Sequence, residues 1–133
     1  MTEFQTILDD FEFLDDWDDR YKYLIDLGRA LPPFPEQNRN DDFKVRGCAS
    51  QVWLVAETDG ETLKLQGDSD AHIVKGLVAV LLALFDGKKL SEAKGLDVQA
   101  ALAPLDLADH LTPQRSNGLA AMIKRIGEIS NAA

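Results

Sequence analysis

The sequence predicts an α+β fold in which a small three-stranded antiparallel sheet packs against helices. Three short stretches of alternating apolar and polar residues lie together between residues 43 and 66. Apolar residues at helical spacing dominate the chain on both sides of these stretches. The chain has 133 residues, of which 45% are hydrophobic, so we expect a single domain over residues 1–133 with its own core.

The chain before the sheet predicts two helices and a long connection. Apolar residues recur at helical spacing over about residues 3–14, which indicates the first helix. Asp16 is a suitable cap for a second helix, which should end near Ala30 because prolines at 32 and 33 cannot continue it. Residues 32–42 show neither the helical nor the strand spacing of apolar residues. They predict a loop, which is either ordered on the surface or mobile.

Acidic residues are concentrated in this N-terminal part. Residues 1–26 hold nine acidic residues against Arg20 and Lys22, a net charge of −7 out of −9 for the whole chain. We interpret this segment as a solvated helix face. The alternative is that this segment is a docking surface for a basic protein. The chain would then be an interaction module, and its cysteine would be structural. The negative charge disfavours nucleic acid as a partner, because phosphate binding requires a basic face.

The three predicted strands cover residues 43–47, 51–57 and 62–66. The middle one is apolar on both faces, which is typical of a central strand. Asp59-Gly60 predicts the hairpin turn between the second and third strands.

A buried helix should follow the sheet. Residues 70–85 are apolar nearly all round, and Asp68 or Ser69 can cap this helix. Gly76 costs about 1 kcal/mol relative to alanine inside a helix, so its presence indicates close packing against another backbone. The longest apolar run, residues 76–85, is shorter than the ~20 residues that span a bilayer. We therefore expect no membrane partner.

The rest of the chain predicts two short helical turns and one long helix. Ser91 and Asp97 are candidate caps for the short ones. Thr112 followed by Pro113 is a strong start signal, and the last helix should run to about Ser130.

The one cysteine, Cys48, follows Gly47 at the predicted tip of a loop that leads into the second strand. A single thiol excludes an internal disulfide and fits a reducing compartment, so we expect a cytoplasmic protein without a signal peptide. Its thiolate would be a nucleophile or a carrier, with Arg46 and Arg115 as candidate positive neighbours. The alternative is an inert, partly buried cysteine.

A cysteine hydrolase or transferase would also need a histidine base near the thiol. The chain contains His72 and His110, of which His110 is the candidate base and both also suit structural or exposed positions. No metal-ligand spacing, GxGxxG motif or P-loop is present, so we expect neither a metal nor a cofactor.

Four segments in this order resemble the SufE family, to which the CsdE proteins are closely related. They are GCASQVW at residues 47–53, LQGDSDA at 65–71, IVKGL at 73–77 and HLTPQRSNGL at 110–119. The resemblance extends over about residues 4–129. The family often has a longer polar residue after the cysteine, where this chain has Ala49.

The resemblance implies a sulfur-transfer protein with a fold similar to that of IscU-type scaffold proteins. A cysteine desulfurase of the SufS or CsdA type, which holds its own pyridoxal phosphate, would form a persulfide and pass its terminal sulfur to Cys48. The carrier would thereby stimulate the desulfurase and deliver sulfur to an iron–sulfur scaffold complex. The residues expected to support the loop or contact the partner are Gly47, Ser50, Gln51, Asp70 and Arg115.

Overall fold

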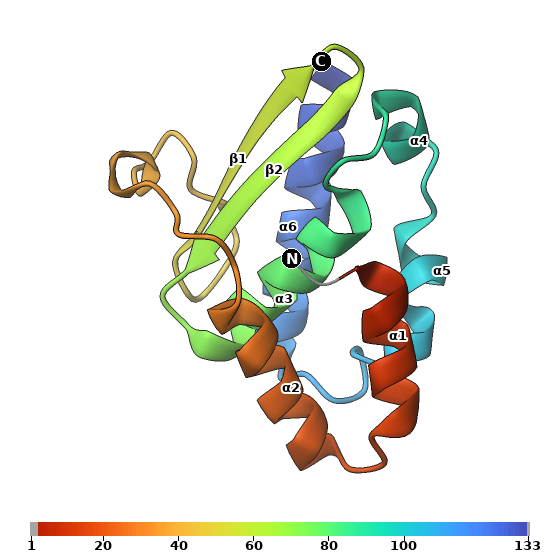
Figure 1. The fold of residues 1–133 in the computed structure, drawn as a ribbon. Helices are drawn as coiled ribbons and strands as arrows, with labels where there is room; N and C mark the ends of the chain where they lie inside the picture. The colour runs from red at the N-terminus through yellow and green to blue at the C-terminus, as the bar shows by residue number, and fades with distance from the viewer. Residues whose placement is uncertain (1–2, 133) are drawn as a thin grey trace.

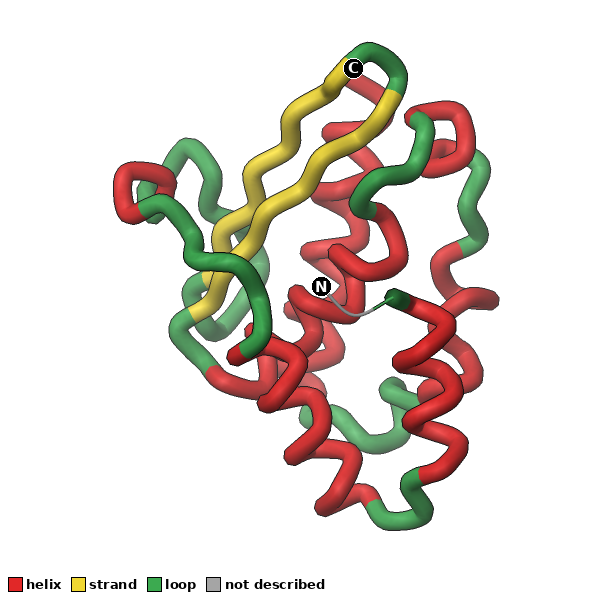
Figure 2. Tube along the Cα trace, in the orientation of Figure 1, coloured by secondary structure: helices red, strands yellow, loops and turns green. Residues whose placement is uncertain are grey.

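A β-hairpin and a set of helices make up the protein, as seen in a computed structural model that describes residues 3–132. The hairpin lies along one side of the molecule, with α3 and α6 behind it and the α1–α2 pair beyond its lower end (Figures 1 and 2). The elements are α1 (Phe4–Phe13), α2 (Trp17–Arg29), the 3-10 turn η1 (Glu36–Asn38), β1 (Val52–Asp59), β2 (Thr62–Ser69), α3 (His72–Phe85), α4 (Leu90–Lys94), α5 (Val98–Leu102), the 3-10 turn η2 (Ala103–Leu105) and α6 (Pro113–Ala132).

The first two helices form as predicted, and they run in opposite directions (Figure 1). Asp16 caps α2 by accepting a hydrogen bond from the backbone N–H of Asp18 at 2.7 Å. Arg20 on α2 donates to the backbone carbonyls of Phe11 and Leu14 at 2.9 Å each. These bonds satisfy carbonyls that the end of α1 leaves without a helical partner.

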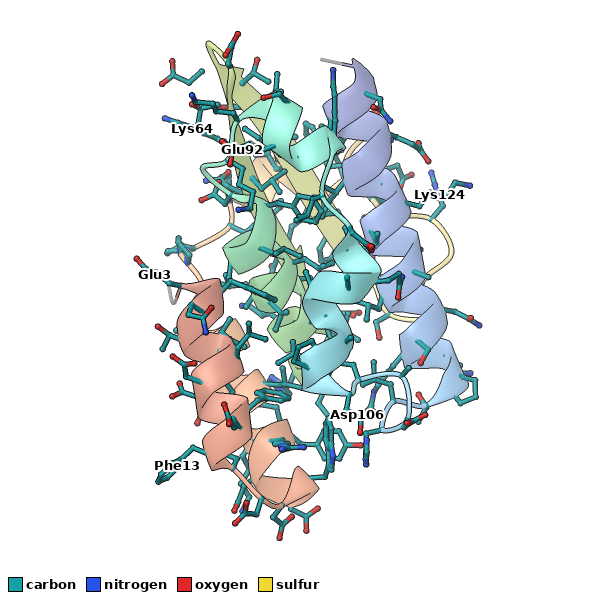
Figure 3. The ribbon with its side chains drawn as sticks, turned by 90° about the vertical axis from the view of Figure 1, so that its right-hand side faces the viewer. Glu3, Phe13, Lys64, Glu92, Asp106 and Lys124 are labelled. Carbon is teal, nitrogen blue, oxygen red and sulfur yellow. The ribbon has the colours of Figure 1, made fainter. Side chains whose placement is uncertain are left out.

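Exposed carboxylates cover much of the surface of this helix pair. Phe13 at the end of α1 is 87% exposed and points away from the molecule (Figure 3). No bound group in the structure shows what would cover this surface.

Helix α3 is the buried centre of the fold, as predicted. Ten of its 14 residues are buried, and it packs against α1, α2, α6 and β2. A Cβ atom at Gly76 would lie 2.2 Å from the carbonyl oxygen of Leu24 on α2. A Cβ atom at Gly28 would lie 2.8 Å from the backbone nitrogen of Gly76. The predicted close approach of two backbones is therefore confirmed, and glycines on both helices permit it.

The sheet has two strands, so the prediction of a third strand over residues 43–47 is wrong. Strands β1 and β2 pair from Val52 opposite Ser69 to Asp59 opposite Thr62. Residues 43–47 contribute only an isolated bridge between Lys44 and Trp53. The chain turns at both ends of this segment, at the turn over residues 40–43 and at Gly47, whose φ is +90°. Too few residues remain between the turns to form a strand.

Strand β2 is longer than predicted, and α3 begins later. Asp68 and Ser69 belong to the strand, where they lie opposite Trp53 and Val52, and so do not cap the helix. Helix α3 begins at His72 without a side-chain cap, and the Ser69 hydroxyl accepts from the N–H of Ala71, just before the helix, at 3.2 Å. Pairing with the buried start of β1 outweighs the capping tendency of these polar residues.

The connection between α2 and β1 is ordered and covers the outer face of the sheet. Phe34 packs with Trp53 and Val55 in a small second core, which Phe43 completes. This connection runs along the edge of the hairpin in orange and yellow (Figure 1). The first half of β1, residues 52–55, is therefore buried on both faces, as its sequence predicts.

The short helix α5 and the long helix α6 both begin as predicted. Asp97 caps α5 through the N–H of Ala100 at 3.1 Å. Helix α6 begins at Pro113, and the Thr112 hydroxyl accepts from the N–H of Arg115 at 3.3 Å. This start places the first turns of α6 beside the loop that contains the cysteine, since both line the same cavity.

Candidate functional site

The loop that contains the cysteine leaves and rejoins the fold at one narrow neck. Val45 and Val52 are joined by a backbone hydrogen bond of 2.8 Å, and both side chains are buried. Residues 46–51 lie between them. Gly47 has a φ of +90°, which an L side chain rarely adopts, and a Cβ atom there would lie 3.4 Å from Cβ of Ala121 on α6. The neck and Gly47 together direct the loop against α6.

Cys48 is half-buried and faces the backbone of α6. Its thiol donates to the carbonyl oxygen of Gly118, with the two atoms 3.6 Å apart. A Cβ atom at Gly118 would lie 3.7 Å from the sulfur, an ordinary contact distance, so the thiol rests directly over this glycine. Burial raises the pKa of the Cys48 thiol, because an apolar environment disfavours the thiolate. In this position the sulfur rests as a thiol.

A cavity of about 220 Å³ opens beside the thiol. A second sulfur atom bonded to Cys48 would lie about 2 Å from the first, so the cavity has ample room for it. The first turn of α6 forms part of the wall, and its N–H groups give it partial positive charge. The lining residues are Cys48, Ala49, Ser50, Val74, Thr112, Gln114, Arg115 and Gly118.

The far end of the loop is fixed by hydrogen bonds to the end of β2. The N–H of Gln51 donates to the Asp70 carboxylate at 3.0 Å. The carbonyl of Gln51 accepts from the Ser69 hydroxyl at 2.8 Å and from the N–H of Asp70 at 3.2 Å. Both backbone polar groups of Gln51 are thus bound, which leaves residues 46–50 as the part of the loop that these bonds do not hold.

The structure therefore divides the predicted site residues into two groups. Ser50 and Arg115 line the cavity beside the thiol. Gly47, Gln51 and Asp70 do not line it and instead shape or hold the loop. The roles of all five in function stay predictions.

Sequence reasoning missed several residues that surround the thiol. Val74, Thr112, Gln114 and Gly118 line the cavity, yet none of them was predicted as a site residue. A signal was available, because all four lie in the segments 73–77 and 110–119 that carry the family resemblance, and a glycine inside a predicted helix, such as Gly118, often marks a close contact.

His110 lies in a different environment from Cys48. Its ring stacks on Trp17 with centroids 4.0 Å apart, and its Nδ1 is 3.1 Å from the carbonyl oxygen of Asp106. The Tyr21 hydroxyl donates to its backbone carbonyl. Among residues 3–132, no histidine lines the cavity beside the thiol. The pair that a cysteine hydrolase requires is therefore not assembled in this structure.

A larger hollow of about 320 Å³ lies on another side of α6. Its walls come mostly from apolar side chains of α5, η2, α6 and the segment between η2 and α6, with Asp106 and Gln99 among the polar ones. Cys48 does not line it, so the thiol chemistry belongs to the smaller cavity.

The described part of the chain contains neither a candidate metal site nor a candidate membrane-spanning helix. No group of three or more His, Cys, Asp or Glu side chains within residues 3–132 is placed to hold a metal ion. None of the helices in that range combines the length and hydrophobicity needed to cross a membrane.

Comparisons with known proteins give matches over nearly the whole chain. The model of the SufE family, described as an Fe-S metabolism associated domain, matches residues 5–130. An uncharacterized SufE-like protein from Rhizobium etli is 52% identical, covering 96% of this chain and 89% of that protein. A second uncharacterized SufE-like protein, from Rhizobium meliloti, is 51% identical, covering 95% and 93%.

A solved structure shares the fold. The solution structure of a hypothetical protein from Thermus thermophilus matches with a TM-score of 0.78, covering 98% of this chain and 94% of that one. At 20% sequence identity, this likeness supports the fold alone.

Proposed function

The chain belongs to the SufE family, and from this membership we propose that it accepts sulfur from a cysteine desulfurase onto Cys48 and carries it toward iron–sulfur cluster assembly. The observation that carries the proposal is the placement of the one thiol. It rests directly over Gly118, beside a cavity that can hold one more sulfur atom.

The transfer is a thiol–disulfide-type exchange between two cysteines. The Cys48 sulfur loses its proton and attacks the terminal sulfur of the desulfurase persulfide. A new sulfur–sulfur bond forms on Cys48, the persulfide bond of the desulfurase breaks, and its cysteine leaves as a thiolate that takes up a proton. The chain has no second cysteine, so the new persulfide cannot be lost to an internal disulfide.

The resting geometry also requires the loop to move. A half-buried thiol bound to Gly118 cannot reach another protein's active site, so the partner must select a state in which residues 46–50 have swung out. After the transfer, the loop would return the persulfide to the cavity, away from reductants. Stimulation follows because removal of the persulfide frees the desulfurase for another turnover.

The test is the intact mass of the protein after incubation with a cysteine desulfurase, its pyridoxal phosphate and free cysteine. We expect a gain of one sulfur atom that disappears on reduction and does not occur in Cys48→Ser. A competent desulfurase that leaves the wild-type mass unchanged would sink the proposal. A gain that persists in Cys48→Ser would mean that another residue accepts the sulfur.

Arg115 provides a second prediction. Its guanidinium lines the cavity beside the thiol and is half-exposed, so it is available to a partner that reaches Cys48. Arg115→Ala should weaken desulfurase stimulation by about tenfold, the effect of losing one hydrogen bond to a charged group. Alkylation of Cys48 by iodoacetamide should be retained.

The matched control for this substitution is Lys124→Ala, which removes an exposed cation from the same helix (Figure 3). Lys124 does not line the cavity, so stimulation should stay at the wild-type level. If Arg115→Ala stimulates as well as Lys124→Ala does, Arg115 has no part in the site.

A further inference from the structure

A buried carboxylate that the proposed sulfur chemistry does not use lies where three segments meet. Asp68 on β2 is 4% exposed. Arg39, from the connection before β1, donates to one carboxylate oxygen through Nε at 2.8 Å and approaches the same oxygen through Nη2 at 2.7 Å. The ammonium of Lys75 on α3 lies 3.2 Å from the other oxygen. Asp68 thus ties the connection and α3 to the end of the sheet.

Asp68 is held in its ionised form by these partners. Burial disfavours its charge, but the bond from Arg39, the Lys75 ammonium and the N–H of Ser69 outweigh burial and lower the pKa of Asp68. A buried charge with two cationic partners is costly to disturb, because removing one side leaves the others without compensation. Its position is therefore well determined.

Asp68 acts on the arm that leads into the cysteine loop. Arg39 belongs to the segment that covers the sheet, and its guanidinium also lies 6.0 Å from the centre of the Phe34 ring. Directly after Arg39, the chain turns and pairs with β1 through the bond from the N–H of Leu54 to the carbonyl of Phe43, at 2.9 Å. The loop begins just beyond this pairing, so fixing Arg39 fixes its first arm.

The arm that leaves the loop is held by the same strand. Asp68 lies opposite Trp53 in the hairpin, and the two residues that follow it, Ser69 and Asp70, hold Gln51. The Asp68 side chain therefore joins the first arm, through Arg39, to the strand that fixes the second arm.

We propose that Asp68 is a positioning residue for Cys48, whose ion pair with Arg39 holds the first arm of the loop against the strand that fixes the second arm, and thereby keeps the thiol against Gly118. This inference deepens the proposed function, because the resting position of the loop sets how readily the thiol leaves its cavity to accept sulfur. Weakening the ion pairs of Asp68 shifts the loop toward the state in which residues 46–50 have swung out, while the rest of the fold persists.

The test is the rate of Cys48 alkylation by iodoacetamide as a function of pH, in Asp68→Asn and Arg39→Met. Both variants should react several-fold faster than wild type at pH 7, up to the roughly tenfold gain of a fully accessible thiol. The curve of rate against pH should also move to lower pH, because an exposed thiol loses the burial that raises its pKa. Arg39→Lys should restore most of the wild-type behaviour, since it keeps a cation near Asp68.

A control separates positioning from general loss of stability. Ile7 on α1 is fully buried, so Ile7→Val and Ile7→Ala lower stability by graded amounts. Of these two Ile7 variants, the control is the one whose free energy of unfolding in urea is closer to that of Asp68→Asn. This control should keep the wild-type alkylation rate and the wild-type curve of rate against pH. Equal acceleration in this control, or a wild-type curve in Asp68→Asn and Arg39→Met, would overturn the proposal.

The design remains decisive if one variant fails. Arg39 lies on the surface, so Arg39→Met tests the proposal even if Asp68→Asn does not fold. Alkylation requires no desulfurase, so its outcome is independent of whether the wild-type protein accepts sulfur. A chain that gains no sulfur would refute the proposed function and leave the role of Asp68 in positioning the thiol to be judged by the alkylation curves.

Discussion

Replacing Gly76 with alanine should lower the free energy of unfolding by about 3 kcal/mol, a large share of the roughly 5–15 kcal/mol that stabilises a typical domain. The new methyl group would lie 2.2 Å from the carbonyl oxygen and 2.6 Å from the carbonyl carbon of Leu24. Both are backbone atoms, so no side chain can rotate away. Helices α2 and α3 must separate at their closest contact, and urea unfolding monitored by circular dichroism would measure the loss.

Gly127 on α6 offers a matched control. It also lies inside a helix, but a Cβ atom there would meet nothing within 4 Å. Gly127→Ala should therefore stabilise the protein by about 0.5–1 kcal/mol, because alanine is the better helix former. The same glycine-to-alanine change would thus lower the free energy of unfolding at position 76 and raise it at position 127. Equal effects at both would show that α2 and α3 do not approach each other as closely as this structure has them.

The parts of the fold that could be predicted are those determined by neighbouring residues. The caps at Asp16, Asp97 and Thr112 are confirmed, because a cap is a contact over two or three positions. The central helix is confirmed, because its apolar residues occupy nearly every position. The hairpin is confirmed for the same kind of reason, since Gly60 in its turn has the positive φ that its sequence favours.

The errors come from competition between local tendency and distant partners. Residues 43–47 alternate like a strand, yet turns at both ends leave only an isolated bridge. Asp68 is of a residue type that often caps helices. It is instead bound within the sheet by Arg39, 29 positions earlier, and by Lys75. No local pattern reveals a partner that tertiary folding brings from that distance.

The candidate site shows the same division. Cys48 and Gly47 stand out in the sequence as a thiol next to a flexible residue. The acceptor of the thiol hydrogen bond is the backbone of Gly118, 70 positions later, and backbone groups leave no chemical signature in a sequence. Arg115 was identified through the resemblance to a family rather than through any spacing that relates it to Cys48.

Cys48 of the resting protein should react slowly with iodoacetamide at neutral pH. Burial raises the pKa of the thiol above its ordinary value of 9.0, so about one molecule in a hundred or fewer holds a thiolate at pH 7. The rate should rise about tenfold from pH 7 to pH 8 without levelling off, because only the thiolate reacts and the pKa of the thiol lies above this range. Since Cys48 is the only cysteine, the mass of the whole protein reports this rate without interference.

The urea-unfolded chain is the reference for this measurement. Its thiol is fully accessible and no longer buried, so at pH 7 it should react roughly tenfold faster than that of the folded protein. A folded protein whose rate levels off below pH 8 would contradict the prediction, because it would contain an activated thiolate, as a cysteine hydrolase does. If the prediction holds, deprotonation of Cys48 depends on leaving the cavity, and sulfur transfer is coupled to the partner that draws the loop out.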